Sequence, residues 1–449
     1  MERMLKLGYP AYSIFRRQNY TSKCVTSQRK NNPTIEISLT DIAPGGYAVG
    51  HYKGHRVLVP YAIPGERVAV RLINTNEREW LAEGVQLVEA SADRIKPRCP
   101  HFGPGRCGGC QWQHMTYQAQ IALKTAIVID QLTRFGGLDD PPVQFAIACP
   151  AQWGYSSQAT FFPTKDDQLG FRATDPRQVT PIEECHVVQP DLMHLLDELD
   201  LDLENLREVR LNLSEDHQHL LVLRSKDDNP PELEITLPVS VNFLLSDNEP
   251  CNMVGSTHVV HQVDGRWFRV TAGVSFRSNV PQMETMAKVI LDYLGLQGRE
   301  SVLDLYGGVG IFSAMVSDKA DFVTYVDSYP PAATDAEANL ADLENVDIIE
   351  GSVESFLGEL LENGQTYDAV ILDPPHTGLT DDAIEGIGDL KFTRLVYISQ
   401  DPVTLARDVK ILTRKYGYQL IDVQPIDFAP QTANIQCVAL LEHPESRDA

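Results

Sequence analysis

The sequence of 449 residues contains no long hydrophobic segment. No apolar run approaches the roughly 20 residues that a membrane-spanning helix needs, and the N-terminus lacks the apolar core of a secretory signal peptide. Aromatic residues are also few, at 8% beside a hydrophobic content of 43%, as in ordinary globular proteins. We therefore expect a cytoplasmic, monomeric protein of about three domains with no membrane partner.

Positive charge is scarce as well. The chain has 38 Lys and Arg against 62 Asp and Glu, a net charge of −24, whereas proteins that bind nucleic acid usually present a basic surface to the phosphates. The segment 33–110 is nearly balanced, however, and it holds a compact basic cluster. The RNA-binding candidates in this cluster are Arg94, Lys96, Arg98 and Arg106. Solvated surface charge is the alternative interpretation.

Three of the eight cysteines stand close together in the segment CPHFGPGRCGGC. Cys99, Cys107 and Cys110 have the spacing C-x7-C-x2-C, which in a reducing compartment points to metal or iron–sulfur ligation rather than to disulfides. The glycines between them allow a tight loop with amides directed at sulfur. Cys185 is the best candidate for a fourth ligand. The spacing alone does not distinguish structural zinc from a [4Fe–4S] cluster.

The order of sequence patterns predicts an α/β protein in several parts, without internal repeats. Residues 1–32 form a basic extension that we expect to be flexible. Residues 33–93 alternate apolar and polar positions between Gly and Pro turns, which predicts a small antiparallel β-barrel. A helix is expected over 114–135, ended by Gly136 and Gly137. Residues 94–275 are assigned to a central α+β domain.

The C-terminal part, residues 276–449, alternates between helical and buried-strand patterns. Strands are expected at SVLDLY, FVTYVDS, YDAVILD and LVYISQ, each followed by a turn or a helix. Alternation of this kind predicts a doubly wound parallel sheet, the Rossmann-like architecture. The last two strands, YQLIDVQPI and NIQCVALLEH, lie so close together in sequence that an antiparallel edge is expected.

A glycine turn follows the first of these strands in the segment DLYGGVG, Asp304 to Gly310. Such a turn lets a nucleotide-like ligand approach the backbone, and a carboxylate at the end of the next strand, Asp327, can accept both ribose hydroxyls. Asp373 ends a third strand at the same edge. The signature G-x-G-x-x-G is missing, which favours S-adenosylmethionine (SAM) over NAD. The candidate cofactor contacts are Tyr306, Gly308, Gly310, Asp327 and Asp373.

These motifs, in this order, resemble the RNA uracil-C5 methyltransferase family, which modifies uridines in tRNA and 23S rRNA. The resemblance extends from residue 33 almost to the C-terminus. It implies an RNA-binding TRAM barrel in residues 33–93 and a SAM-dependent methyltransferase domain in residues 276–449. It also implies a [4Fe–4S] cluster on Cys99, Cys107, Cys110 and Cys185, although the interval from Cys99 to Cys107 is two residues longer than expected.

The two reactive groups of that family are replaced in this chain. The family's cysteine attacks carbon 6 of uracil, and a glutamate then removes the proton from carbon 5 after methyl transfer. The aligned residues here are Gln400, in ISQDP, and Gln436, in PQTANIQCVALL. Nearby, His376 replaces the arginine of DPPR, and Ser278 replaces a glutamine expected to contact SAM. No catalytic residue is therefore assigned with the family's role.

Two interpretations follow from these replacements. In the first, the protein keeps the fold and binds RNA, SAM or both, but does not methylate carbon 5 of uracil. In the second, it is an active SAM-dependent methyltransferase of rRNA or tRNA with non-covalent chemistry, for example on an amino group held by Asp373 and its neighbours. His376 is either a titrating group near neutral pH or a polar rim residue. Cys437, next to Gln436, is expected to be a packing residue.

Overall fold

The computed structural model describes residues 34–75, 79–232, 234 and 236–444. The extension expected over residues 1–32 lies outside the described residues. The chain forms two compact units. The first comprises Met1–Ile127, Phe171–Thr180 and Pro430–Ala433, and the second comprises Val128–Gly170, Pro181–Ala429 and Asn434–Ala449.

The first unit contains a small closed barrel of five strands. In barrel order these strands are β1 (Thr34–Ala43), β2 (Tyr47–Tyr52), β3 (His55–Val59), β5 (Glu79–Glu89) and β4 (Arg67–Asn74). All neighbours pair antiparallel except β3 and β5. Alternate apolar side chains, among them Ile37, Val57, Val59 and Val70, fill the interior. The predicted small barrel is therefore confirmed, and a two-residue turn at Lys53 and Gly54, both with positive φ, joins β2 to β3.

The helix expected over residues 114–135 is present in two parts. The α-helix α2 (Tyr117–Gln131) continues into one turn of π-helix, η3 (Leu132–Gly136). Gly137 adopts a left-handed conformation and its amide donates to the carbonyl of Leu132. The glycine thus ends the helix as the sequence predicts.

Another sheet has seven strands and mostly antiparallel pairing. Its order is β12 (Pro250–Val254), β11 (Val239–Leu244), β10 (His219–Ser225), β9 (Leu206–Leu213), β6 (Gln158–Pro163), β7 (Leu169–Arg172) and β8 (Val179–Pro181). β10 and β11 pair in parallel, whereas β9–β10, β11–β12, β6–β7 and β6–β9 pair antiparallel. The helix α3 (Pro190–Glu198) precedes β9, and a separate hairpin consists of β13 (His258–Val263) and β14 (Arg266–Thr271).

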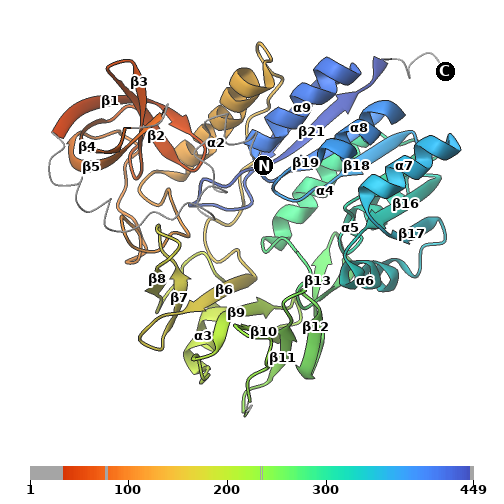
Figure 1. The fold of residues 1–449 in the computed structure, drawn as a ribbon, viewed down its shortest axis with the longest axis horizontal. Helices are drawn as coiled ribbons and strands as arrows, with labels where there is room; N and C mark the ends of the chain where they lie inside the picture. Colours follow the sequence, from red (N-terminus) through yellow and green to blue (C-terminus); the bar gives the residue numbers. More distant parts are fainter. Residues whose placement is uncertain (1–33, 76–78, 233, 235, 445–449) are drawn as a thin grey trace. The chain divides into compact units, whose positions relative to one another are not determined.

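The other sheet is the doubly wound sheet that the sequence predicts. Its order is β17 (Val346–Glu350), β16 (Phe322–Asp327), β15 (Ser301–Leu305), β18 (Ala369–Leu372), β19 (Arg394–Ser399), β21 (Gln436–Glu442) and β20 (Gln419–Ile426). The five strands from β17 to β19 run parallel, whereas β21 pairs antiparallel with both β19 and β20. The expected antiparallel edge is confirmed. Figure 1 shows β21 beside β19.

Helices connect these strands. They are α4 (Val280–Leu294), α5 (Ile311–Ser317), α6 (Pro330–Leu340), α7 (Val353–Asn363), α8 (Asp381–Leu390) and α9 (Pro402–Tyr416). The central strands read as continuous apolar runs, and all four residues of β18 are buried, because helices cover both faces of the sheet. The carboxyl ends of β15, β16, β18 and β19 therefore meet at one edge, where ligands of such sheets bind.

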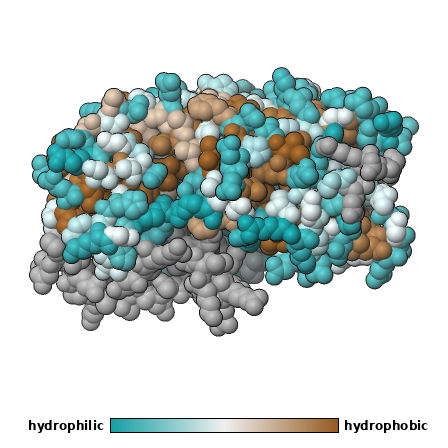
Figure 2. Space-filling model, turned by 90° about the horizontal axis from the view of Figure 1, so that it is seen from above, coloured by the Kyte–Doolittle hydropathy of each residue, from teal (hydrophilic) through white to brown (hydrophobic). Residues whose placement is uncertain are grey.

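The surface is mixed in character. Hydrophobic residues on the face shown in Figure 2 form separate patches between hydrophilic ones. Among the helices of the described residues, none is long and apolar enough to cross a membrane.

A buried ion pair stabilises the barrel. The carboxylate of Glu66, which is 1% exposed, binds the guanidinium of Arg94 through both oxygens, at 2.5 and 2.7 Å. It also accepts the amides of Ile63 and Ser91. Burial raises the pKa of Glu66, but these hydrogen bonds and the charge of Arg94 outweigh it and hold the pKa below its ordinary value.

We predict that Glu66→Gln lowers the free energy of unfolding by about 3 kcal/mol at pH 7, because it leaves the charge of Arg94 without its partner. The folded-state pKa of Glu66 is lowered, so its stabilisation is present above the ordinary value of 4.5 and is lost as the pH falls. Urea denaturation at pH 7 and pH 4 measures both effects. The control is Glu36→Gln, because Glu36 is an exposed partner of Arg67 and its loss costs little. An equal decrease in the free energy of unfolding of Glu66→Gln and Glu36→Gln would refute the prediction.

Candidate functional site

The turn after β15 has an unusual backbone. Tyr306, Gly308 and Gly310 all have positive φ, of 62°, 56° and 84°, and for tyrosine this conformation is strained. Gly307 has no room for a side chain, since an added Cβ would lie 2.3 Å from the ring of Tyr325. The amides of Tyr306 and Gly307 both donate to the carbonyl of Val326. The predicted glycine turn is thus packed tightly against the end of β16.

The carboxylate of Asp327 lies beside this turn. Asp327 ends β16 and accepts the amide of Gly308 through Oδ2, at 3.0 Å, and the amide of Tyr329 through Oδ1, at 2.9 Å. Each oxygen of a carboxylate has a second lone pair, so Asp327 can still accept ribose hydroxyls. Burial raises the pKa of Asp327, and the backbone amides partly offset this. The predicted contacts Tyr306, Gly308, Gly310 and Asp327 therefore lie together.

Asp304, in β15, is fully buried below the turn. Its Oδ2 accepts both the amide and the hydroxyl of Ser313, at 3.0 and 2.6 Å, while no partner within the described residues binds Oδ1. Burial raises the pKa of Asp304 to about 7, against the hydrogen bonds of Ser313 and with a further contribution from the charge of Asp373. Near neutral pH this carboxyl is thus close to half protonated.

Arg277 binds two of the predicted site residues. Its Nη1 and Nη2 donate to Oδ2 and Oδ1 of Asp373, both at 2.7 Å, in a bidentate ion pair. Its Nε donates to Oε1 of Gln436, also at 2.7 Å. The guanidinium carbon lies 6.0 Å from the centroid of the Phe428 ring. The guanidinium of Arg277 thus connects the loop before α4 with the residue that follows β18 and the first residue of β21.

The end of β19 carries no free nucleophile. Gln400 is exposed, and the hydroxyl of Ser399 is occupied, since it donates to the carbonyl of Asp401 and accepts its amide. The carboxylate of Asp401 caps α9 by accepting the amide of Val403. Burial raises the pKa of Asp401, and the neighbouring His376 and Arg407 oppose this. His376 itself is exposed.

Cys437 follows Gln436 in β21 and lies opposite Ser399 of β19. Its thiol is completely buried, and burial raises its pKa far above the ordinary value. A thiol in this state is a packing group rather than a nucleophile.

The cysteine loop belongs to the first unit. Cys99, Cys107 and Cys110 are all partly exposed, and the amide of Gly109 donates to Sγ of Cys107 at 3.4 Å. Gly108 has to be glycine, because an added Cβ would lie 2.9 Å from the carbonyl oxygen of Ala173. Within the described residues, no three His, Cys, Asp or Glu side chains are grouped as a metal site. Cys185, in the second unit, is also partly exposed.

The four residues of the predicted basic cluster differ in exposure and in hydrogen-bond partners. Lys96, Arg98 and Arg106 are exposed, and the guanidinium of Arg106 donates to the carbonyl of Pro100. Arg94 is instead held by Glu66. Its charge is thus compensated inside the barrel.

An aromatic group on the barrel was not found from the sequence. The ring of His55 stacks on Trp80, with centroids 4.2 Å apart and an angle of 15°, and Tyr52 lies 6.4 Å from the same indole. The ammonium of Lys53 lies 5.3 Å from the Tyr52 ring. His55 and Lys53 are exposed. Aromatic rings beside a cation form the kind of surface on which unpaired nucleobases stack.

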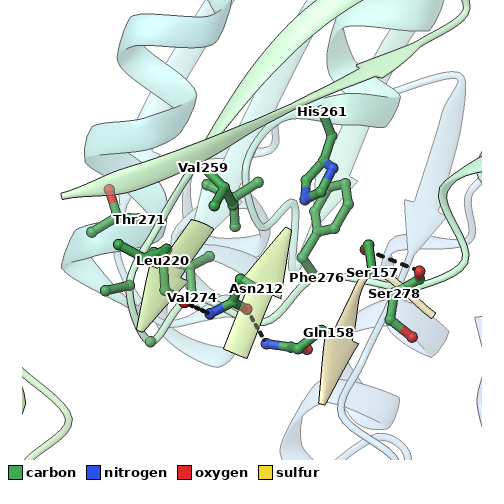
Figure 3. Close-up of a pocket in the computed structure, with 13 residues that line it drawn as sticks. Ser157, Gln158, Asn212, Leu220, Val259, His261, Thr271, Val274, Phe276 and Ser278 are labelled. Atoms are coloured by element: carbon green, nitrogen blue, oxygen red, sulfur yellow. Dashed lines mark hydrogen bonds between the residues drawn. The ribbon is translucent and has the colours of Figure 1, made fainter. Parts of the chain in front are cut away.

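A small pocket of about 20 Å³ lies among β6, β9, β13 and the loop that follows β14. In Figure 3 the ring of His261 faces Phe276, and the two are stacked with centroids 4.7 Å apart. Burial lowers the pKa of His261 to about 4, so the imidazole is neutral. The hydroxyl of Ser157 donates to the carbonyl of Ser278, and both residues line the pocket (Figure 3). This volume accommodates a water molecule rather than a nucleobase.

Arg277 is the site residue that the motif comparison missed. The segment SFRS places an arginine between Phe276 and Ser278, where the resembling family segment reads SFFQ. An arginine at that point and a neutral residue in place of a glutamate at position 436 were both visible in the sequence. Their contact was not, because 159 positions separate them along the chain.

Sequence relatives cover most of the chain. A family model described as "Conserved hypothetical protein 95" matches residues 259–414. A protein of Streptomyces avermitilis named "Uncharacterized RNA methyltransferase" is 31% identical over 427 residues, which cover 91% of this chain and 98% of that protein. A protein of Aquifex aeolicus with the same name is 30% identical over 430 residues, covering 92% of this chain and 99% of that protein.

A solved structure shares the fold. The tRNA (uracil-54, C5)-methyltransferase of Pyrococcus abyssi, determined in complex with S-adenosyl-L-homocysteine (SAH), matches with a TM-score of 0.69 and 22% identity. The match covers 91% of this chain and 100% of that protein. At this identity the similarity establishes the fold alone.

We predict that stability falls by about 1.4 kcal/mol between pH 6 and pH 8 because of Asp304. The folded-state pKa, about 7, is raised above the ordinary 3.8, so the native state holds a proton that the unfolded chain has lost, and this stabilisation disappears as the pH rises through 7. Asp304→Asn should remove this part of the pH dependence. Urea denaturation of both proteins at pH 6, 7 and 8 measures it. If the free energy of unfolding changes equally with pH in the wild type and in Asp304→Asn, the pKa of Asp304 is not raised.

Proposed function

Because the chain belongs to a family of RNA methyltransferases, we propose that it binds RNA and an adenosyl cofactor but does not methylate carbon 5 of uracil. The RNA would be rRNA or tRNA, as the resemblance to uracil-C5 methyltransferases implies. The cofactor would be SAM or its product SAH, the ligand named with the Pyrococcus abyssi structure.

The observation that carries this proposal is the set of contacts around Gln436 and Gln400. Methylation of carbon 5 needs a thiolate to attack carbon 6 and a base to remove the proton from carbon 5. An exposed amide stands at the nucleophile position, and the amide oxygen at the base position accepts a hydrogen bond from Arg277. The buried thiol of Cys437 and the hydrogen-bonded hydroxyl of Ser399 supply neither function.

The second candidate function, methylation of an amino group by non-covalent chemistry, is less well supported by the same geometry. An enzyme of that kind uses the side chain at the position of Asp373 to accept a hydrogen bond from the target amino group. Both oxygens of Asp373 already bind Arg277, at 2.7 Å each. The Arg277 guanidinium supplies only donors, which suit carbonyl or phosphate oxygens rather than an amino group.

Cofactor binding is supported by the turn at Tyr306 and the carboxylate of Asp327. The turn brings its backbone beside a carboxylate that keeps capacity to accept further hydrogen bonds, an arrangement suited to a ribose. Ser278, in place of a glutamine, removes one expected contact, since its side chain is shorter. The site would therefore retain most of its adenosyl contacts.

A [4Fe–4S] cluster would be held by Cys99, Cys107, Cys110 and Cys185. The donor chemistry fits, because thiolates are the usual cluster ligands and the amide of Gly109 already donates to Sγ of Cys107. The narrow passage beside Ala173, which admits only glycine at position 108, fixes the course of this loop.

RNA binding would use the barrel. The resemblance implies that it is a TRAM module, and Tyr52, His55 and Trp80 form a stacking surface next to Lys53. Lys96, Arg98 and Arg106 add positive charge in the same unit. The protein as a whole is strongly acidic, so binding should depend on stacking and fall steeply with salt.

We predict that the anaerobically purified protein binds SAH with micromolar affinity in isothermal titration, and that Asp327→Asn weakens binding about tenfold. The reason is that a charged acceptor for ribose hydroxyls is lost. Asp368→Asn is the matched control, since Asp368 binds Ser301 at the start of β15, the opposite end of that strand. Absence of binding at millimolar SAH would overturn cofactor binding.

We predict that Tyr52→Ala and His55→Ala each weaken binding of single-stranded RNA about tenfold, because each removes a ring on which a base can stack. Fluorescence anisotropy with a labelled oligonucleotide at two salt concentrations measures this. Trp267→Ala is the control, since Trp267 is equally aromatic and 50% exposed but lies on the β13–β14 hairpin. Equal affinities of all three variants and the wild type would exclude the barrel rings as RNA contacts.

A further inference from the structure

The ion pair of Arg277 and Asp373 changes the charge of the candidate cofactor site. Both side chains are only 13% exposed, and two hydrogen bonds of 2.7 Å align the guanidinium with the carboxylate. The third partner, Gln436, is neutral and accepts from Nε. The three side chains together therefore carry no net charge.

This neutral group lies at the same edge of the sheet as the candidate cofactor contacts. Asp373 is close enough to Asp327 and Asp304 that its charge raises the pKa of both carboxyls. Asp327 is the candidate ribose acceptor, and Asp373 follows β18, which is two strands away from β16 in the sheet. A ligand whose ribose binds Asp327 would thus place its neighbouring groups near the Arg277–Asp373 pair.

The two adenosyl ligands differ in charge at one atom. SAM has a sulfonium with a permanent positive charge, whereas the sulfur of SAH is a neutral thioether. A free carboxylate several ångströms away attracts the sulfonium and leaves the thioether unaffected. In a partly buried site the attraction between one carboxylate and the sulfonium contributes about 1.4 kcal/mol or more to the free energy of binding, which is about tenfold in affinity.

We infer that Arg277 is a specificity-determining residue that makes this site favour the uncharged thioether, SAH, over the sulfonium, SAM. The inference rests on the proposed binding of an adenosyl cofactor. Arg277 compensates the charge of Asp373, and Gln436 adds none, so positions 373 and 436 attract a sulfonium less than an unpaired carboxylate and a glutamate would. A protein of this kind would be occupied by the product form of the cofactor and would bind RNA without transferring a methyl group.

The test is the ratio of the dissociation constants for SAM and SAH, measured by isothermal titration on the full-length protein. The wild type should bind SAH more tightly. Arg277→Met frees the Asp373 carboxylate and should shift the ratio about tenfold toward SAM. Gln436→Glu adds a carboxylate by an independent change and should shift the ratio in the same direction. Because each ratio is taken within one protein, partial loss of folded material does not affect it.

Arg394→Gln is the control for loss of an arginine from the same sheet. Arg394 begins β19 and pairs with Glu442, so it lies at the end of that strand opposite to Ser399 and Gln400. Its ratio should equal that of the wild type. Unchanged ratios in both Arg277→Met and Gln436→Glu would overturn the inference while cofactor binding stands. Failure of the wild type to bind either nucleoside would instead overturn the proposed function.

Discussion

The contact of one guanidinium with Asp373 and Gln436 determines what the strand ends of the parallel sheet can do. A doubly wound sheet places the carboxyl ends of its strands at one edge, and reactive groups gather there in enzymes of this architecture. In this protein that edge holds an arginine whose three hydrogen bonds engage the carboxylate after β18 and the amide that begins β21. The oxygens that could accept a proton, or a hydrogen bond from an amino group, thus already accept hydrogen bonds from Arg277.

The neighbouring polar residues are held in fixed orientations by hydrogen bonds. Asp327 is oriented by two backbone amides and Asp304 by Ser313, while Gly307 lets the turn approach the Tyr325 ring closely. Orientation of this kind suits a ligand that is recognised by hydrogen bonds. Beyond β19 the exposed amide of Gln400 and the capped hydroxyl of Ser399 offer no nucleophile.

Most of the fold could be predicted from the sequence, because local periodicity determines it. Alternation in residues 33–93 predicted the barrel, and buried runs such as AVIL, separated by helical segments, predicted the parallel sheet. The glycine turn could be predicted because glycines directly follow the strand in DLYGGVG. The close packing against Tyr325 explains why position 307 has to be glycine. The replacements Gln400 and Gln436 were visible because flanking motifs fixed their positions.

The contacts of the site could not be predicted in the same way. Arg277 meets Asp373 across 96 positions and Gln436 across 159, and no local pattern records a pairing of that span. The stacking of His55 on Trp80 across two strands of the barrel depends on strand register, which the pattern of apolar residues does not reveal. Arg94 looked like a surface cation because its partner Glu66 is 28 positions earlier.

The most direct measurement is nucleoside mass spectrometry of rRNA and tRNA that have been incubated with the protein and methyl-deuterated SAM. RNA from a strain lacking uracil-C5 methylation would supply unmodified uridines, and an active uracil-C5 methyltransferase would serve as the positive control. A site without thiolate and base should leave no deuterated 5-methyluridine, although the protein binds the cofactor. Deuterated 5-methyluridine that disappears in Gln400→Ala would contradict the proposed loss of uracil-C5 chemistry.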